Sequence, residues 1–298
     1  MARVTRVSFP PPHAWARMEG LGNDFIVVLA DSAEAALPSA AEVRELCDRH
    51  LGLGGDGLLW LVVHDDGTPR MTVLNADGSR AAMCGNGLRC AALYLTDRGL
   101  APRDAVFAMQ TDSGPRRIKV RDADRIEAWL EIPELQPVNL PADPSVAHGS
   151  RVLASGATQL QLDGEMSWGT LVSMGNPHLV LIDPDWSREQ FLRIGHGAQH
   201  HPALPEGINL GWARLSGPDS LELEVWERGV GPTRACGTGA AAAAVAASLA
   251  QNRYGTWLVH QPGGTLRCTW PGPDEPVIQI GPARWIATGN WPTVTRSR

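Results

Sequence analysis

Short apolar runs separated by turn residues fill most of this chain of 298 residues. The runs FIVVL (25–29) and LLWLVV (58–63) are continuous, whereas RRIKVR (116–121) and LELEV (221–225) alternate polar and apolar positions. Short continuous runs are typical of buried strands, and alternation is typical of strands with one face in solvent. Comparable runs recur to about residue 289, so the pattern predicts a sheet-rich fold.

Helical spacing of apolar residues is confined to a few segments. Residues 39–51 place valine, leucine and cysteine on one face after a serine, and a shorter helix is expected around 187–194. The two most marked helices follow glycine-rich loops. They are LRCAALYLTDRG (88–99) and an alanine-rich stretch that runs to about Gln251.

One loop-to-helix element occurs twice. Cys84-Gly85-Asn86-Gly87 opens the first marked helix, and Cys236-Gly237-Thr238-Gly239 opens the second, 152 positions later. Other landmarks repeat at offsets of 151 to 153: Gly22-Asn23 with Gly175-Asn176, Asp56 with Asn209, Asn75 with Glu227, and Gly78 with Gly229 or Gly231. A nearly constant offset indicates two copies of one unit.

Many strands around two marked helices, in a repeated chain, predict an α+β fold of two pseudo-symmetric domains. Each domain is expected to be a curled, mostly antiparallel β-sheet or barrel wrapped around a central α-helix. The predicted domains are residues 16–132 with Cys84 and residues 133–283 with Cys236, and the proline-rich stretch 132–145 is the predicted linker. Residues 1–15 and the tail TVTRSR have no predicted role.

Composition excludes several function classes. A net charge of −6 gives no basic field for nucleic acid or an anionic membrane, and no run is apolar enough to span a bilayer. The N-terminus lacks a signal-peptide pattern, so a cytoplasmic enzyme is expected. Five cysteines without a CxxC pair argue against a disulfide scaffold or a zinc ribbon. The only lysine, Lys119, lies in a strand-like run, which disfavours pyridoxal phosphate, so no cofactor is expected.

The repeated cysteines suggest the chemistry. A thiol at a helix N-terminus lies among unpaired N–H groups at the positive end of the helix dipole, where its thiolate is expected to be stabilised. Two such thiols, one from each half, can flank one carbon centre. One thiolate then removes a proton while the opposite thiol delivers one, which is racemisation or epimerisation by general acid-base catalysis. The N–H groups around Gly85, Asn86, Gly237 and Thr238 can hold the adjacent carboxylate.

Polar residues in turns and at strand ends form a predicted specificity set: Asn23, Asn75, Asn176, Asn209, Glu227 and Arg228. Arg228 can grip a carboxylate, while the amides and Glu227 can receive an ammonium. His178 lies close to Asn176 in sequence and is a candidate for tuning a thiolate. The set suits a ligand with charged groups at both ends.

Two rival classes stay open at this stage. One is a metal or redox module that uses Cys84, Cys90, Cys236 and His178, although a Cys-x5-Cys spacing is unusual for zinc. The other is a non-catalytic amino-acid-binding protein, which has no need for two activated thiols. Cys47, Cys90 and Cys268 are expected to be core residues.

At these motifs the sequence resembles the diaminopimelate epimerases. The matching stretches are GLGNDFIVV (20–28), LNADGSRAAMCGNGLRCAA (74–92), VSMGNPHLV (172–180), GIN (207–209) and WERGVGPTRACGTGAAAA (226–243). The resemblance implies a cofactor-independent interconversion of LL- and meso-2,6-diaminopimelate, in lysine and peptidoglycan precursor synthesis. An alternative is a racemase of another amino acid on the same fold, similar to proline racemase.

The resemblance also implies residue roles. Cys84 and Cys236 are the base and acid pair, and His178 and Glu227 tune the thiols. The substrate-binding residues are Asn23, Asn75, Gly85, Asn86, Asn176, Asn209, Glu227, Arg228, Gly237 and Thr238. A homodimer is implied, as is a last strand, about 284–298, that returns to the first domain. Glu19 departs from the family pattern, in which a histidine is frequent, and Gly57 stands where some members have a glutamine.

Overall fold

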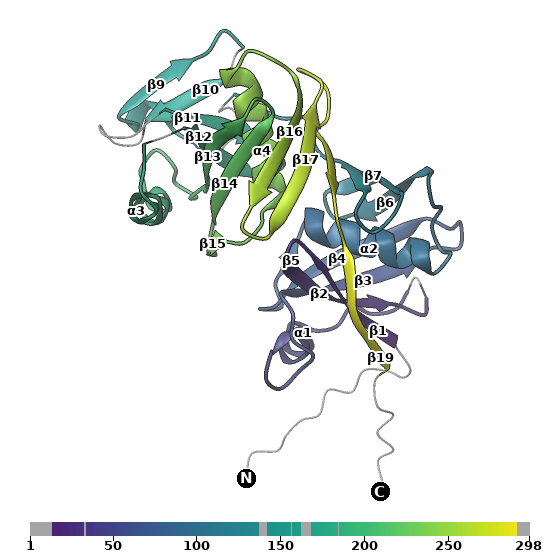
Figure 1. The fold of residues 1–298 in the computed structure, drawn as a ribbon. Helices are drawn as coiled ribbons and strands as arrows, with labels where there is room; N and C mark the ends of the chain where they lie inside the picture. The colour runs from purple at the N-terminus through teal and green to yellow at the C-terminus, as the bar shows by residue number, and fades with distance from the viewer. Residues whose placement is uncertain are drawn as a thin grey trace, which may run out of the picture. The chain divides into compact units, whose positions relative to one another are not determined.

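A computed structural model of the chain describes residues 14–32, 34–136, 142–155, 157–161, 168–183 and 185–290. Most of the N-terminal stretch 1–15 and the whole tail TVTRSR therefore lie outside the described residues. The chain forms two compact units (Figure 1). The first runs to Ala128 and resumes at Gly281, and the second is Trp129–Ile280.

The first unit is one mixed sheet. Strands β19, β1 and β2 pair antiparallel, β2 pairs parallel with β3, β3 pairs antiparallel with β4, β4 pairs with β5 and, in parallel, with β6, and β6, β7 and β8 pair antiparallel. The strands are β1 (Ala14–Gly20), β2 (Asn23–Leu29), β3 (Gly57–Val63), β4 (Pro69–Asn75), β5 (Arg80–Ala81), β6 (Val106–Thr111), β7 (Gly114–Val120), β8 (Ile126–Trp129) and β19 (Arg284–Asn290).

The second unit repeats this order. Strands β11 and β12 pair antiparallel, β12 and β13 parallel, β13 and β14 antiparallel, β14 pairs with β15 and, in parallel, with β16, and β16, β17 and β18 pair antiparallel. The strands are β9 (Gly149–Val152), β10 (Thr158–Gln161), β11 (Gly169–Ser173), β12 (Pro177–Ile182), β13 (Asn209–Gly217), β14 (Ser220–Glu227), β15 (Gly231–Thr233), β16 (Gly255–Gln261), β17 (Gly264–Trp270) and β18 (Ile278–Gly281), with a 3-10 turn at Pro144–Val146.

Strand for strand, β1 to β8 correspond to β11 to β18. This shared topology confirms the predicted pseudo-symmetric α+β fold. Each sheet is curled, and the closed barrel that the prediction left open as an alternative is not formed.

One helix occupies the centre of each unit. Helix α2 (Gly85–Asp97) packs against β1 to β4 and β7, and every residue from Gly85 to Thr96 is buried. Helix α4 (Gly237–Ala250) packs against β11 to β14, β16 and β17. Its run of alanines from 240 to 244 is fully buried, because small side chains let strands approach the helix from several sides.

Two shorter helices lie on the outside of the sheets. Helix α1 (Ala40–Cys47) is capped by Ser39 and ends earlier than predicted, because the Asp48 carboxylate accepts the next backbone N–H groups in a turn. Helix α3 (Arg188–Ala198) is capped by Ser187 and is longer than predicted, since its later residues Gly195 and Ala198 are also buried. Cys47, Cys90 and Cys268 are buried as expected.

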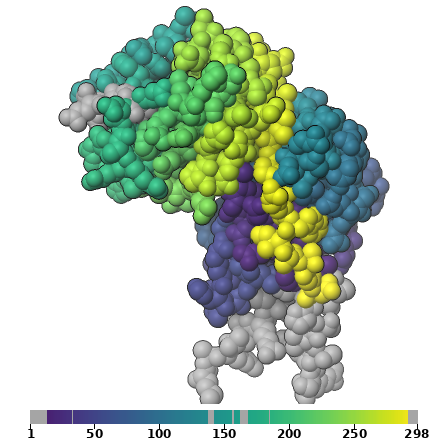
Figure 2. Space-filling model, viewed as in Figure 1, coloured from purple at the N-terminus to yellow at the C-terminus, as the bar shows by residue number. Residues whose placement is uncertain are grey.

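The last described strand closes the first sheet. Strand β19 pairs antiparallel with β1, with Ala14 opposite Asn290, and Figure 2 shows this yellow strand at the surface beside the purple start of the chain. The proline-rich stretch 132–145 belongs, where described, to the second unit, because Glu134 and Ser173 exchange backbone hydrogen bonds. No helix among the described residues is long and apolar enough to cross a membrane.

Candidate active site

Cys84 is the N-cap residue of α2. Its backbone is extended, and the first intrahelical bond joins the Leu88 N–H to the Cys84 carbonyl at 2.8 Å. The N–H groups of Gly85 and Asn86 therefore precede the helical hydrogen-bond pattern and point toward the positive end of the helix dipole. The thiol is partly exposed.

Asn23 is presented by the tight turn between β1 and β2. The two turn residues, Leu21 and Gly22, both have positive φ, at 58° and 80°. This conformation costs a leucine of the order of 1 kcal/mol or more, and burial of the Leu21 side chain opposes that cost. Glu19 supports the turn by accepting the Gly22 N–H at 2.8 Å, which accounts for a carboxylate at this position.

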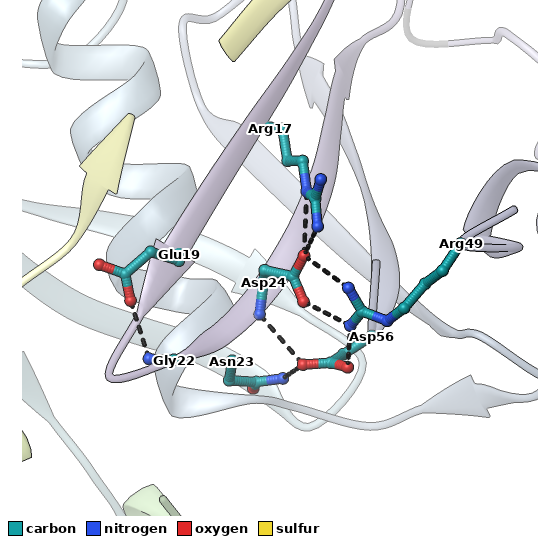
Figure 3. Close-up of polar contacts among 7 residues, drawn as sticks. All are labelled: Arg17, Glu19, Gly22, Asn23, Asp24, Arg49 and Asp56. Carbon is teal, nitrogen blue, oxygen red and sulfur yellow. Dashed lines mark hydrogen bonds and ion pairs between the residues drawn. The ribbon is translucent and has the colours of Figure 1, made fainter. Parts of the chain in front are cut away.

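The Asn23 amide lies between the Cys84 thiol and a cluster of ion pairs formed by Asp24, Asp56, Arg17 and Arg49. Its Oδ1 is 3.8 Å from the Cys84 Sγ and accepts from the Asn86 Nδ2 at 3.3 Å. Its Nδ2 donates to the Asp56 carboxylate at 2.8 Å (Figure 3). The buried Arg89 donates to the Asn86 Oδ1 at 2.6 Å. Three sequence-predicted site residues, Cys84, Asn23 and Asn86, are thus brought together.

Two aspartates and two arginines form this cluster of ion pairs. Arg49 bridges the carboxylates of Asp24 and Asp56, at 2.7 Å from each, and Arg17 also pairs with Asp24 (Figure 3). Burial alone raises the pKa of Asp24, but the hydrogen bonds from Arg49 and Arg17 outweigh it and the pKa is lowered. Asp24 therefore stays ionised at neutral pH.

Asn75 forms a hydrogen bond within its own turn. It ends β4, is exposed, and donates from Nδ2 to the Ser79 hydroxyl at 2.9 Å. The same turn contains Gly78, whose φ is 83° and where a Cβ would lie 2.6 Å from the Ala40 carbonyl oxygen. Only glycine fits there, so the turn that presents Asn75 is fixed by backbone geometry.

Cys236 is the N-cap of α4 and is 5% exposed. Its Sγ accepts from the Gly239 N–H at 3.4 Å and lies 3.6 Å from the Thr238 hydroxyl. Burial, and then the charge of Glu227, raise the pKa of the Cys236 thiol, although the bonds from Thr238 and Gly239 lower it. The expectation that the helix N-terminus lowers this pKa is therefore wrong, because desolvation outweighs the hydrogen bonds at the helix start.

Glycine at the third helical position makes room for the second cysteine. A Cβ at Gly239 would lie 3.2 Å from the Cys236 Sγ and 3.0 Å from a methyl of Val225. A Cβ at Gly87 would lie 3.6 Å from the Cys84 Cβ, an ordinary contact, and 2.9 Å from a methyl of Leu59. The steric role of the second glycine toward its cysteine is therefore confined to Gly239.

Asn209 links the two turns that contain the other predicted residues of the second unit. Buried at the start of β13, it donates from Nδ2 to the Pro177 carbonyl at 2.8 Å and accepts the Arg228 N–H at 2.9 Å. The Arg228 guanidinium is partly exposed and lies 3.7 Å from Glu206. The neighbouring Glu227 accepts from the Thr233 hydroxyl at 2.5 Å.

His178 is fully buried in β12, with its Nε2 3.1 Å from the Asn176 Oδ1. Burial, aided by the charge of Arg228, lowers the pKa of His178 to about 3. The ring is therefore neutral at physiological pH. Since an amide oxygen only accepts, Nε2 bears the proton. Any effect of His178 on a thiol must act through hydrogen bonds rather than through charge.

Sequence reasoning missed several residues near the helix starts. The Gln261 side chain accepts the Cys236 N–H at 2.8 Å, and Gln279 donates to the Gly237 carbonyl at 2.9 Å. Both lie on strands far along the chain, so no local signal marks them. Arg89 was detectable, because an arginine among the apolar residues of a buried helix demands a partner.

In the described part of the chain, no three His, Cys, Asp or Glu side chains gather as a metal site requires. Against known proteins, the family model for diaminopimelate epimerase matches residues 15–129 and 170–286. A diaminopimelate epimerase of Desulfitobacterium hafniense is 38% identical over 283 residues, which cover 92% of this chain and 96% of that protein. The chain belongs to the diaminopimelate epimerase family.

Further relatives agree with this family assignment. A diaminopimelate epimerase of Desulforudis audaxviator is 38% identical and covers 93% of this chain and 98% of its own. Among solved structures, a predicted epimerase from Pseudomonas aeruginosa has a TM-score of 0.64 at 16% identity, covering 95% of this chain and all of that one. A hydroxyproline epimerase from Agrobacterium vitis has a TM-score of 0.58 at 15% identity, covering 94% and 90%. At these identities the solved structures show the fold alone.

Proposed function

We propose that this family member interconverts LL- and meso-2,6-diaminopimelate by moving one proton at an α-carbon. The observation that supports this most directly is the repeated helix start: Cys84 and Cys236 are the N-cap residues of the central helices in two units of the same topology. A packing role explains one such thiol. It does not explain the same thiol at equivalent positions of both units.

The proposed reaction is a two-base proton transfer. The thiolate of one cysteine forms an S–H bond with the α-proton, and the electron pair of the broken C–H bond passes into the substrate carboxylate. The other cysteine gives its proton to the opposite face of the same carbon and becomes the thiolate. Atoms and charge balance, and the roles of Cys84 and Cys236 exchange in the reverse direction.

The developing negative charge has to be stabilised where it forms. We assign this to the N–H groups of Gly85, Asn86, Gly237 and Thr238, which precede the intrahelical bonds of α2 and α4. The ends of the substrate are assigned to Asn23, Asn75, Asn176, Asn209, Glu227 and Arg228. Arg228 is suited to a carboxylate because its guanidinium is accessible and its ion pair with Glu206, at 3.7 Å, is long.

The setting of the enzyme is part of the proposal. We infer a cytoplasmic enzyme of lysine and peptidoglycan precursor synthesis that acts as a homodimer and uses no pyridoxal phosphate or metal. We also propose that the two catalytic domains are residues 16–132 and 133–283. Analytical ultracentrifugation tests the dimer, and a sedimenting monomer at assay concentration contradicts it.

The decisive assay supplies LL-diaminopimelate to purified protein and follows the meso isomer by chiral chromatography. In deuterated water the α-position of the product should gain deuterium during turnover. L-Proline is the control for the alternative, a racemase on the same fold. Turnover of proline without turnover of diaminopimelate contradicts the proposal, and so does diaminopimelate turnover that requires added pyridoxal phosphate or metal.

A further inference from the structure

The amides near Cys84 form a continuous hydrogen-bonded chain with a charged group at each end. The Arg89 guanidinium donates to Asn86 at 2.6 Å, Asn86 donates to Asn23 at 3.3 Å, and Asn23 donates to Asp56 at 2.8 Å. The chain runs from the fully buried Arg89 on α2 to the partly exposed Asp56 before β3. Figure 3 shows its outer end, where Asn23 meets Asp56.

The ends of this chain decide its direction. A guanidinium can only donate hydrogen bonds and an ionised carboxylate can only accept them. An amide between them satisfies both neighbours only with its oxygen toward the arginine side and its nitrogen toward the aspartate side. If Asn23 turned over, its oxygen would face the oxygen of Asp56 and its nitrogen would face the nitrogen of Asn86. Both contacts would then be repulsive.

Both carboxylate oxygens of Asp56 accept hydrogen bonds. Its Oδ1 is 2.7 Å from Arg49, and its Oδ2 accepts the Asp24 N–H at 3.1 Å as well as the Asn23 amide. The charged and titratable groups around the chain include Arg17 and Glu19 of β1, Asp24 of β2, Cys47 of α1, Arg49, Asp56, and Arg89 and Cys90 of α2.

We propose that Asp56 is a positioning residue that, with Arg89 at the other end, makes Asn23 present its carbonyl oxygen to Cys84. That oxygen is 3.8 Å from the Sγ. It can accept a hydrogen bond from the S–H group and repels a thiolate, so this contact favours the protonated form of Cys84. The proposal rests on the assignment of Cys84 as a catalytic thiol. It adds Asp56 and Arg89, which reach the sulfur only through Asn23 and Asn86.

The test measures the protonation of Cys84 without turnover. Iodoacetamide alkylation of Cys84 is followed against pH by peptide mass spectrometry, which separates this cysteine from the other four. In Asp56→Asn the end group can donate as well as accept, so one of the two repulsive contacts of the reversed Asn23 amide is lost and only the contact with Asn86 still opposes it. The orientation with the NH2 group toward the sulfur should therefore become more populated. Alkylation of Cys84 at pH 7 should become about tenfold faster, the change that one pKa unit gives.

Loss of a negative charge also favours a thiolate, so the charge effect needs its own control. Asp24→Asn removes a charge from the same Arg49 without touching Asn23, and it should change the alkylation rate less than about twofold. In Asn23→Ala the amide is absent, and adding Asp56→Asn should then also have less than about a twofold effect. An equal effect of Asp56→Asn with and without Asn23 overturns the proposal.

A second variant tests the orientation if Asp56→Asn fails to fold. Asn23→Ala removes the proposed acceptor, so Cys84 alkylation at pH 7 should become several-fold faster. Slower alkylation would mean that Asn23 stabilises the thiolate, and it would overturn the proposal. Failure of the diaminopimelate assay leaves these measurements unaffected, because they use no substrate.

Discussion

The two helix starts share a motif and differ in their surroundings. At α2, Cys84 is partly exposed and faces the amide oxygen of Asn23. At α4, Cys236 is buried and receives hydrogen bonds from the helix itself, while the carboxylate of Glu227 acts on it. The motif therefore fixes where each thiol lies, and the neighbouring side chains determine how firmly it holds its proton.

The residues at the paired positions 56 and 209 likewise occupy equivalent places in the two units but form different hydrogen bonds. In the first unit, the Asp56 backbone bonds to the carbonyl of Asp24, at 2.7 Å, and to the N–H of Ala76, at 3.1 Å. In the second unit, the Asn209 side chain bonds to Pro177 and to the N–H of Arg228. Each residue joins the strand residue that follows the first paired asparagine, Asp24 or Pro177, to the turn that leads toward the thiol. The connection is repeated, although different atoms make it.

The largest expected effect on turnover comes from replacing the sulfur atom at each helix start. Cys84→Ser and Cys236→Ser should each lower kcat about 10²- to 10⁴-fold, because a serine hydroxyl is a far weaker acid than a thiol and does not ionise to a base at neutral pH. Binding of diaminopimelate, measured by calorimetry, should be retained in both. Near-normal turnover in either variant would mean that the two starts are not a functional pair.

A smaller difference is expected from the second glycine of each motif. Gly239→Ala forces a Cβ to 3.2 Å from the Cys236 sulfur and 3.0 Å from Val225, so it should cost about 1–3 kcal/mol of stability. Gly87→Ala meets only the far end of Leu59, at 2.9 Å, which can turn away. It should be nearly neutral, since alanine favours a helix. Urea unfolding compares the two, and a costlier change at Gly87 would refute the steric account.

The buried thiol also predicts a loss of stability at alkaline pH. Burial raises the folded-state pKa of Cys236, so above about pH 9 the unfolded chain releases this proton while the folded chain keeps it. Stability should be fully present below pH 8 and fall by roughly 1–2 kcal/mol at pH 10 for such a thiol. Cys47, whose pKa burial raises to about 11, adds to this loss.

Urea titrations at pH 8 and pH 10 measure that loss. Cys236→Ala should lose less stability over this range than the wild type, because one proton fewer is linked to unfolding. Equal losses in the two proteins would place Cys236 in a more solvated environment than the structure gives it.

The smallest expected effect concerns His178. Burial lowers the pKa of His178 to about 3, so the ring stays neutral at all pH values near neutrality. The pH profile of kcat/KM near pH 6.5 should therefore be the same in the wild type and in His178→Gln. The variant should lower kcat less than about tenfold, through the altered bond to Asn176. A pH profile whose acid limb disappears in His178→Gln would show that the ring titrates.

The sequence was sufficient for the elements and the repeat. Apolar runs located the strands, serines at 39 and 187 marked two helix starts, and the Cys-Gly-x-Gly elements placed both thiols at N-caps. These features follow from local backbone preferences and from the spacing of apolar residues, which a single chain displays directly. The extent of α3 was not foreseen, because burial of its last turn depends on contacts with other strands.

The protonation of the thiols was decided by tertiary structure alone. A helix start predicts a lowered pKa, yet packing buries Cys236 beside Glu227 and raises it. Likewise, the sequence marks Asn23 and Asn86 as polar landmarks without saying which way their amides face. That direction depends on Arg89 and Asp56, which come from different elements and meet only in the folded unit. Burial and hydrogen-bond direction are properties of three-dimensional neighbours, so no local pattern in the chain encodes them.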